Sequence, residues 1–236
     1  MTVKMILFTG ILFLGTFLRL WQIGRIPEGF YSDEALYGYE AYSILKTGKD
    51  QFGNFLPLTI AGFGDYRPAL YIYATIPFIA IFGLTEFATR LPSAIFAILS
   101  LPAIFHLAFT LTRNTKIALT CLLIASISPW SLFFSRMAHE TNLMTLLILC
   151  GLLLILHSRK HPILLLFSSI SFAASLYTYH SARVFVPLLV LLTLTLWRKR
   201  VKNNSGMWFA AAVLLIIFLL PLARQYLGGE GLARVR

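Results

Sequence analysis

The sequence predicts an all-α polytopic membrane protein, with about seven transmembrane helices and interfacial helices in its first extracytoplasmic loop. Hydrophobic residues make up 58% of the 236 residues and charged residues only 12%, whereas roughly 25% of a soluble domain is charged. The net charge is +11, but the lysines and arginines lie in short loops between apolar stretches. That pattern is typical of membrane topology and argues against a nucleic-acid partner.

The chain contains apolar segments in an order that leaves no room for a separate soluble domain, so we expect one domain, 1–236. The first segment is long for the apolar part of a signal peptide and no small-residue cleavage site follows it, so we interpret it as an uncleaved span. Cys121 and Cys150 both lie in apolar runs and are interpreted as small hydrophobic residues. The segments are 5–23, 69–84, 88–111, 117–134, 141–156, 163–179, 184–197 and 207–223.

The longest polar connection, 24–68, is rich in glycine and proline and holds most of the acidic residues. We expect a folded loop or surface helices there, within an extracytoplasmic region that extends over 24–87. Ser32 is a candidate N-cap for a helix over 33–46, which Gly48 would end.

The topology depends on segment 69–84, which has 16 residues and contains Pro77. A span and an interfacial helix are both compatible with that length. If the segment is interfacial, every short basic loop lies on one side of the membrane, as the positive-inside rule requires. The residues of these loops are Lys4, Arg113, Lys116, Arg159, Lys160, Arg198, Lys199, Arg200 and Lys202.

The interfacial interpretation also places every carboxylate of the chain on the extracytoplasmic side. A preference of inner loops for basic residues would explain the lack of acids inside, but not their clustering near the bilayer. We therefore expect chemistry or recognition at the outer face. The acids are Glu28, Asp33, Glu34, Glu40, Asp50, Asp65, Glu86, Glu140 and Glu230.

Arginines at the outer ends of the segments suggest an anionic ligand. Arg90, Arg136, Arg183 and Arg224 have this position, and Arg67 begins the interfacial segment. The guanidinium group presents a planar set of donors that suits phosphate oxygens. The alternative is that each arginine pairs with a nearby carboxylate or with lipid headgroups.

Asp33 and Glu34 follow the first span closely, so they are held near the membrane surface. Adjacent residues of a helix point about 100° apart, so we expect one of them to face a site and the other a structural partner. A carboxylate there can act as a general base on an acceptor hydroxyl.

Other polar side chains are candidates for substrate binding at the same face. A neighbouring His and Glu are only weakly suggestive of a metal site, because no third ligand stands at a fixed offset. No cofactor is therefore indicated with certainty, and a divalent metal stays an open alternative that the sequence does not support. The candidates are Tyr66, Arg136, His139, Glu140, His180 and Arg183.

Four stretches of the chain, taken together, resemble the C-type (GT-C) glycosyltransferases, specifically the superfamily of protein O-mannosyltransferases and lipid A aminoarabinosyltransferases. The combination comprises an Asp-Glu pair after the first span, a basic-Pro motif and an Arg-Leu-Pro motif. The stretches are LRLWQIGRIPEGFYSDEALYGYEAYSILKTG, DYRPALYIYATIPFIAIFGLTEFATRLPSAIF, SPWSLFFSRMAHETNL and LYTYHSARVFVPLLVL.

The resemblance implies a membrane glycosyltransferase that moves a hexose or pentose from a polyprenyl-phosphate donor, with inversion, at the extracytoplasmic face of the plasma membrane. The acceptor would be a hydroxyl on a glycolipid, a polysaccharide or a protein. Asp33 matches the presumed catalytic base, with Glu34 as its neighbour. Arg67 and Arg90 match residues that would bind the donor phosphate and assist its departure.

Members of this superfamily are longer and carry further spans, so we expect this chain to be an N-terminal fragment whose activity in isolation is doubtful. Two other functions remain open. A transporter would place its binding residues near the bilayer midplane, and a non-catalytic binder of lipid-linked sugars would need the arginines but not Asp33. The sugar, the acceptor and the oligomeric state are not determined by the sequence.

Overall fold

The computed structural model describes residues 3–62, 64–196 and 204–227, and this part of the chain is almost entirely helical. A two-stranded antiparallel hairpin is the exception. The elements are α1 (Val3–Leu20), α2 (Ser32–Thr47), β1 (Thr59–Gly62), β2 (Asp65–Pro68), α3 (Leu70–Phe82), α4 (Glu86–Thr112), α5 (Thr115–Ile127), α6 (Pro129–Ser135), α7 (Thr141–His157), α8 (Leu164–Leu176), α9 (Ala182–Leu196) and α11 (Ser205–Leu227).

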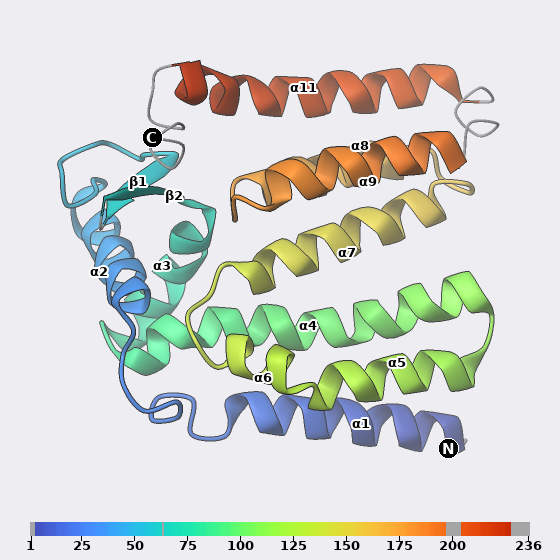
Figure 1. The fold of residues 1–236 in the computed structure, drawn as a ribbon, viewed down its shortest axis with the longest axis horizontal. Helices are drawn as coiled ribbons and strands as arrows, with labels where there is room; N and C mark the ends of the chain where they lie inside the picture. Colours follow the sequence, from blue (N-terminus) through green and yellow to red (C-terminus); the bar gives the residue numbers. More distant parts are fainter. Residues whose placement is uncertain (1–2, 63, 197–203, 228–236) are drawn as a thin grey trace.

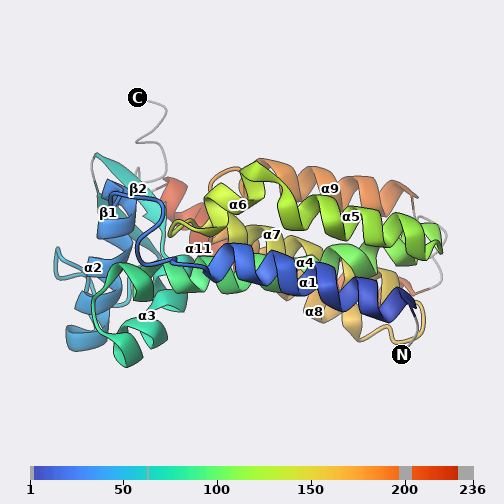
Figure 2. The same ribbon diagram turned by 90° about the horizontal axis from the view of Figure 1, so that it is seen from below.

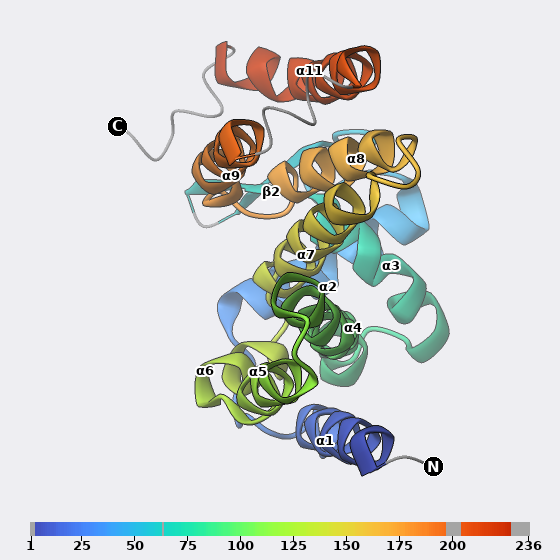
Figure 3. The same cartoon turned by 90° about the vertical axis from the view of Figure 1, so that its right-hand side faces the viewer.

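The helices form an elongated bundle, and further elements lie across one end of it (Figure 1). Helices α1, α4, α5, α7, α8, α9 and α11 run along the long axis, whereas α2, the hairpin and α3 lie across one end. We call these four elements the cap, and Figure 2 shows them at the same end from a second direction. The end-on view of Figure 3 shows α1 at one edge, α4 and α5 next to it, then α7, α8 and α9, and α11 at the other edge.

Three of the described helices, α1, α4 and α11, are long and apolar enough to cross a membrane alone. The bent pair α5 and α6 would make a fourth, and α3, α7, α8 and α9 are shorter apolar helices. The predicted segments therefore all correspond to helices, but 117–134 is broken at Ser128. Helix α3 has 13 residues, or about 20 Å of helix, against roughly 30 Å for the hydrocarbon core.

The cap differs from its prediction in two places. Helix α2 ends at Gly48 in the left-handed conformation, as predicted, but Tyr31 is its N-cap. The prediction for Ser32 is therefore wrong: Ser32 is the first helical residue, and the Glu34 carboxylate accepts the N–H of Tyr31. The hairpin was not predicted, and it places Arg67 and Pro68 in β2, so that α3 begins only at Leu70.

A separate hydrophobic core fixes the cap to the bundle. Buried side chains of α2 and α3 pack with Ile60 of β1, Ala88 of α4 and Leu143 of α7. A second cluster joins α7, α8, α9 and α11. Buried hydrophobic side chains therefore hold the cap against α4 and α7, just as they hold the helices of the bundle together.

The two ends of the bundle carry different charges. The N-terminus, the α4–α5 connection and the α7–α8 connection lie at the end opposite the cap (Figure 1). These two connections contain or adjoin Arg113, Lys116, Arg159 and Lys160, whereas the acids of 28–86 and Glu140 belong to the cap end. The basic residues 198–202 and Glu230 lie outside the described residues.

Candidate active site at the cap end

The first turn of α2 and strand β2 bring together an ion pair that is open to the surroundings. Arg67 Nη2 lies 2.9 Å from Asp33 Oδ1, and the two side chains are 12% and 33% exposed. The Arg67 guanidinium also stacks over the ring of Tyr37, 5.9 Å from its centroid. Its Nη1 is buried and has no hydrogen-bond partner among the described residues. Arg67 therefore keeps a free donor beside Asp33.

Glu34 and Arg90 form a second pair, which is fully buried. Arg90 donates Nε to Oε1 and Nη2 to Oε2 of Glu34, at 2.9 and 3.0 Å. Its remaining N–H groups go to backbone carbonyls, at Ile23 and Pro27 from Nη1 and at Gly29 from Nη2. Because a guanidinium has five N–H groups, Arg90 has none left for a ligand in this arrangement.

Glu34 links three parts of the chain. Besides Arg90, its carboxylate accepts the N–H of Tyr31 at 3.1 Å and the N–H of Ala138 at 2.7 Å. The first of these contacts starts α2, and the second holds the α6–α7 connection. Asp33 and Glu34 thus diverge, one toward an open pair and the other toward structural partners.

Tyr37 connects the open pair to Glu140. Its hydroxyl donates to Glu140 Oε2 at 2.7 Å, and both residues are buried. Burial and the Glu140 carboxylate raise the pKa of Tyr37 far above its usual value, so the phenol stays protonated and acts as the donor. The edge of the Tyr71 ring packs against it.

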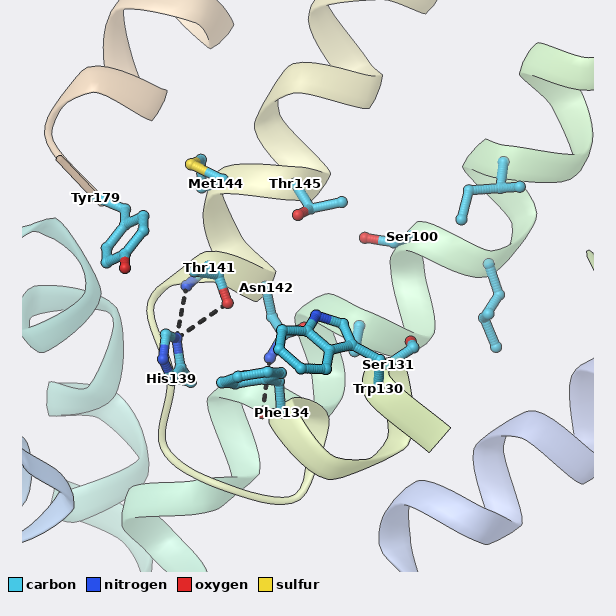
Figure 4. Close-up of a pocket in the computed structure, with 13 residues that line it drawn as sticks. Ser100, Trp130, Ser131, Phe134, His139, Thr141, Asn142, Met144, Thr145 and Tyr179 are labelled. Atoms are coloured by element: carbon cyan, nitrogen blue, oxygen red, sulfur yellow. Dashed lines mark hydrogen bonds between the residues drawn. The ribbon is translucent and has the colours of Figure 1, made fainter. Parts of the chain in front are cut away.

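His139, the neighbour of Glu140 in the sequence, lines a cavity of about 480 Å³ (Figure 4). The Thr141 backbone N–H donates to His139 Nδ1 at 3.3 Å, so a neutral ring carries its proton on Nε2. The cavity lies between α4, α6 and α7, with Tyr179 at its side. It is lined by Ala97, Ser100, Leu101, Ile104, Trp130, Ser131, Phe134, His139, Thr141, Asn142, Met144, Thr145 and Tyr179.

His180 fastens the α8–α9 connection to the cap. Its Nε2 lies 2.9 Å from the Tyr66 carbonyl oxygen, and Arg183 Nη1 lies 3.1 Å from its Nδ1. The backbone adds a second tie, from Leu70 N–H to the carbonyl of Tyr177 at 3.2 Å. The candidate residues Tyr66, His180 and Arg183 thus meet at the hairpin, as expected for one face.

Arg136 turns toward α1 instead of the open pair. It donates to the carbonyls of Leu18, Trp21 and Ile26, at the end of α1 and just beyond it. Burial, with a smaller contribution from the Arg90 charge, lowers its pKa. Of the candidate arginines, Arg67 has the position best suited to a ligand.

Sequence reasoning missed Tyr37 and Arg19 as residues of this region. Tyr37 lies four positions after Asp33 and so on the same helix face, which could have indicated it. Arg19 lies inside the first apolar segment, and an ionisable residue inside a span is a candidate for a special role. Among the described residues, no three His, Cys, Asp or Glu side chains gather in a group that could hold a metal ion.

The fold and the site together define a helical membrane protein in which the described acids and the arginines Arg67, Arg90, Arg136 and Arg183 gather at one end. Residues 66–223 match the sequence profile of the family described as dolichyl-phosphate-mannose-protein mannosyltransferase. The chain belongs to this family of membrane glycosyltransferases, which depend on lipid-phosphate sugars, and the GT-C resemblance is confirmed. No curated protein and no solved structure matches the chain. Asp33 and Glu34 precede the matched residues.

Proposed function

We propose that this protein transfers a sugar from a polyprenyl-phosphate donor to a hydroxyl of a glycolipid, polysaccharide or protein at the extracytoplasmic face of the plasma membrane. The family description names mannose on dolichyl phosphate, so a mannosyl donor is the first to test. The observation that carries the proposal is the open Asp33–Arg67 pair, in which Arg67 has an unused buried donor.

The proposed topology has seven spans, with the cap outside. Support comes from the short α3, which lies with α2 and the hairpin, and from the basic connections at the opposite end (Figure 1). Helices α1, α4, α5 with α6, α7, α8, α9 and α11 would then cross the membrane. Asp33 and Arg67 would lie at headgroup depth, where a lipid-linked phosphate resides.

Arg67 is the proposed donor-phosphate ligand, and Asp33 is the proposed base. A phosphate oxygen that binds Arg67 competes with Asp33 for the guanidinium and so frees this carboxylate. Asp33 then takes the proton of the acceptor hydroxyl while the acceptor oxygen bonds to the anomeric carbon. The bond from that carbon to the phosphate oxygen breaks, and its electrons leave with polyprenyl phosphate. A single displacement of this kind inverts the anomeric centre.

The other candidates receive different roles. Because all five N–H groups of Arg90 bind Glu34 and backbone carbonyls, we assign Glu34 and Arg90 to positioning of the site, in place of contact with the donor. Glu140 and His139 would contact substrate from the α6–α7 side, since Tyr37 places Glu140 next to Arg67. His180 holds the hairpin that carries Tyr66 and Arg67.

The test is transfer of radiolabelled sugar from polyprenyl-phosphate donors in membranes that express the intact protein. Asp33→Asn should lower turnover by about 10²- to 10⁴-fold, the usual contribution of general base catalysis, and should leave donor binding intact. Arg67→Ala should instead weaken donor binding by roughly 10- to 150-fold, because a hydrogen bond to a charged group contributes about 1.5–3 kcal/mol. Glu28→Gln, an exposed acid before α2, is the control.

A transporter or a non-catalytic binder would not respond in this way. Either would retain its function in Asp33→Asn, and neither would produce labelled product with the wild-type chain. Normal transfer by Asp33→Asn would refute the assignment of the base, and donor affinity unchanged in Arg67→Ala would refute that of the phosphate ligand.

A further inference from the structure

The break between α5 and α6 leaves backbone carbonyls without their helical donors. The two helices meet at an angle of 55°, and Pro129 is the first residue of α6. In a continuous helix the carbonyls of Ala125 and Ser126 would accept the N–H groups of residues 129 and 130. Proline has no N–H, and the bend breaks the register for Trp130. Buried carbonyls of this kind need other partners.

Arg19 of α1 supplies these partners. Its Nη2 donates to the Ala125 carbonyl at 2.9 Å, and its Nη1 donates to the Ser126 carbonyl at 3.0 Å. Nη2 also donates to Ser131 Oγ of α6 at 2.8 Å. The side chain of Arg19 is completely buried. One guanidinium thus binds both sides of the break, which the planar, two-pronged geometry of arginine permits and that of lysine does not.

Gly15 allows α1 to lie close enough for this contact. A Cβ at this position would lie 2.8 Å from both Leu101 Cδ1 and Ser126 Oγ. Arg136, directly after α6, makes the opposite connection: it donates to the carbonyls of Leu18 and Trp21 at the end of α1. Arg19 of α1 therefore caps carbonyls at the end of α5, and Arg136, just after α6, caps carbonyls at the end of α1 and just beyond it.

The contacts of Arg19 and Arg136 hold one wall of the cavity beside the candidate active site. Trp130, Ser131 and Phe134 of α6 line that cavity, and Ser131 is itself an Arg19 partner. The α6–α7 connection continues from Arg136 to Ala138, whose N–H binds Glu34. The direction of α6 therefore sets both the shape of the cavity and the placement of the connection.

We propose that Arg19, with Arg136, is a positioning residue that holds α6 at its angle to α5 and keeps the cavity open for the lipid-linked donor. The role rests on the proposed function, because it assumes that the lipid-linked donor occupies this cavity. Arg19 itself contacts no substrate: it acts through the backbone of α5 and the hydroxyl of Ser131.

The first experiment measures the bend directly and needs no activity. Spin labels are placed at Ile117→Cys on α5 and Phe133→Cys on α6, both exposed, after Cys121 and Cys150 are replaced by Ala. A straight helix would separate these positions by about 24 Å along its axis, and the bend shortens this distance. Arg19→Leu should lengthen or broaden the distance distribution, as should Arg19→Lys, whereas Arg25→Leu on the exposed loop should leave it unchanged. An unchanged distribution in Arg19→Leu would overturn the proposal.

The second experiment separates positioning from stability. Pro129→Ala restores an N–H donor for the Ala125 carbonyl, so the double variant Arg19→Leu/Pro129→Ala should recover the melting temperature that Arg19→Leu loses. Its α5 and α6 should form one straighter helix, and its KM for the donor should rise about tenfold or more, because small displacements near a reacting centre are costly. A double variant with wild-type KM and kcat would show that the bend positions nothing.

The transfer assay on Asp33→Asn and the label distance in Arg19→Leu together distinguish this inference from the proposed function. If Asp33→Asn keeps full transfer activity while Arg19→Leu changes the label distance, the assignment of the base fails and the role of Arg19 in the bend stands. If Asp33→Asn loses activity and the label distance does not respond to Arg19→Leu, the reverse holds.

Discussion

The two acid–arginine pairs that start in the first turn of α2 differ mainly in burial. Asp33 and Arg67 are accessible, whereas Glu34 and Arg90 are enclosed and fully hydrogen-bonded. Removal of one member of a buried pair leaves an uncompensated charge, which is far more costly than the loss of an exposed pair. This difference in burial supports the proposal that the first pair performs the chemistry and that the second has a structural role.

Glu34→Gln should destabilise the folded protein by about 3–5 kcal/mol, because Arg90 would stay buried without its counter-charge. The measurement is unfolding of the purified protein in mixed detergent micelles. Glu86→Gln is the matched control: Glu86 also faces Arg90, at 3.7 Å, but it is 46% exposed, so its loss should change stability by less than about 1 kcal/mol. Equal stability of the two variants would contradict the structural role of Glu34.

Glu40 should make stability depend on pH. Burial raises the pKa of its carboxyl above the ordinary 4.5, and the nearby Asp50 charge adds to the shift. The folded state then binds this proton more tightly than the unfolded state, so the contribution of Glu40 to stability is fully present below pH 4.5 and is lost as pH rises through the raised pKa. Glu40→Gln should remove this slope, and melting temperatures measured against pH would show it. Glu28→Gln is the control and should keep the wild-type slope. An unchanged slope in Glu40→Gln would contradict the role of Glu40.

Some of the side-chain arrangement in the candidate site could be predicted from the sequence. The divergence of Asp33 and Glu34 could be predicted, because helix geometry separates adjacent side chains. The pairing of Asp33 with Arg67 could not, because it depends on a hairpin that closes over α2. The same holds for Arg90: its position in the sequence suggests a phosphate ligand, but only the fold shows the carbonyls of Ile23, Pro27 and Gly29 around it.

Among the elements, α3 decides the topology. It contains 13 residues with Pro77 inside and lies in the cap (Figure 1). Helix α8 is equally short, with 13 residues, so length alone does not distinguish the two helices. Helix α8 runs along the long axis of the bundle, whereas α3 lies across one end with α2 and the hairpin (Figure 1). The orientation of α3 therefore supports the proposed interfacial placement.

Labelling of single cysteines tests this arrangement. In a background without Cys121 and Cys150, a membrane-impermeant thiol reagent should label Phe52→Cys of the cap in intact cells. Thr115→Cys, at the start of α5 directly after the α4–α5 connection, should be labelled only after the cells are permeabilised. Labelling of Thr115→Cys in intact cells would show that α3 spans the membrane, and the proposed orientation of every later loop would then be inverted.

Elements were predictable where apolar composition alone defines them. The described long helices match the predicted segments, because about 20 apolar residues in lipid have few alternatives to a helix. The hairpin was missed because its strands have four residues each, too few for a clear alternation. The break between α5 and α6 was missed because segment 117–134 is continuously apolar, and the meaning of Pro129 depends on a distant donor, Arg19.

In the whole molecule, the charged residues are distributed along the long axis of the bundle. The described acids lie in or next to the cap at one end of the bundle, and the described basic connections lie at the other end (Figure 1). This separation was predictable from the sequence, because it follows from the order of polar loops along alternating helices. The layering of the helices from α1 to α11 (Figure 3) was not predictable, since it depends on close contacts such as the one between Gly151 and the ring of Phe172.

The tie between His180 and the Tyr66 carbonyl joins residues 114 positions apart. During synthesis the hairpin emerges long before its partner on the α8–α9 connection. The cap, with Arg67 beside Tyr66, therefore lacks this support until α8 has entered the membrane. Completion of the proposed active site is consequently expected to be a late event in the biosynthesis of the protein. A chain interrupted before residue 180 would contain Asp33 and Arg67 but would lack the contact between His180 and the hairpin.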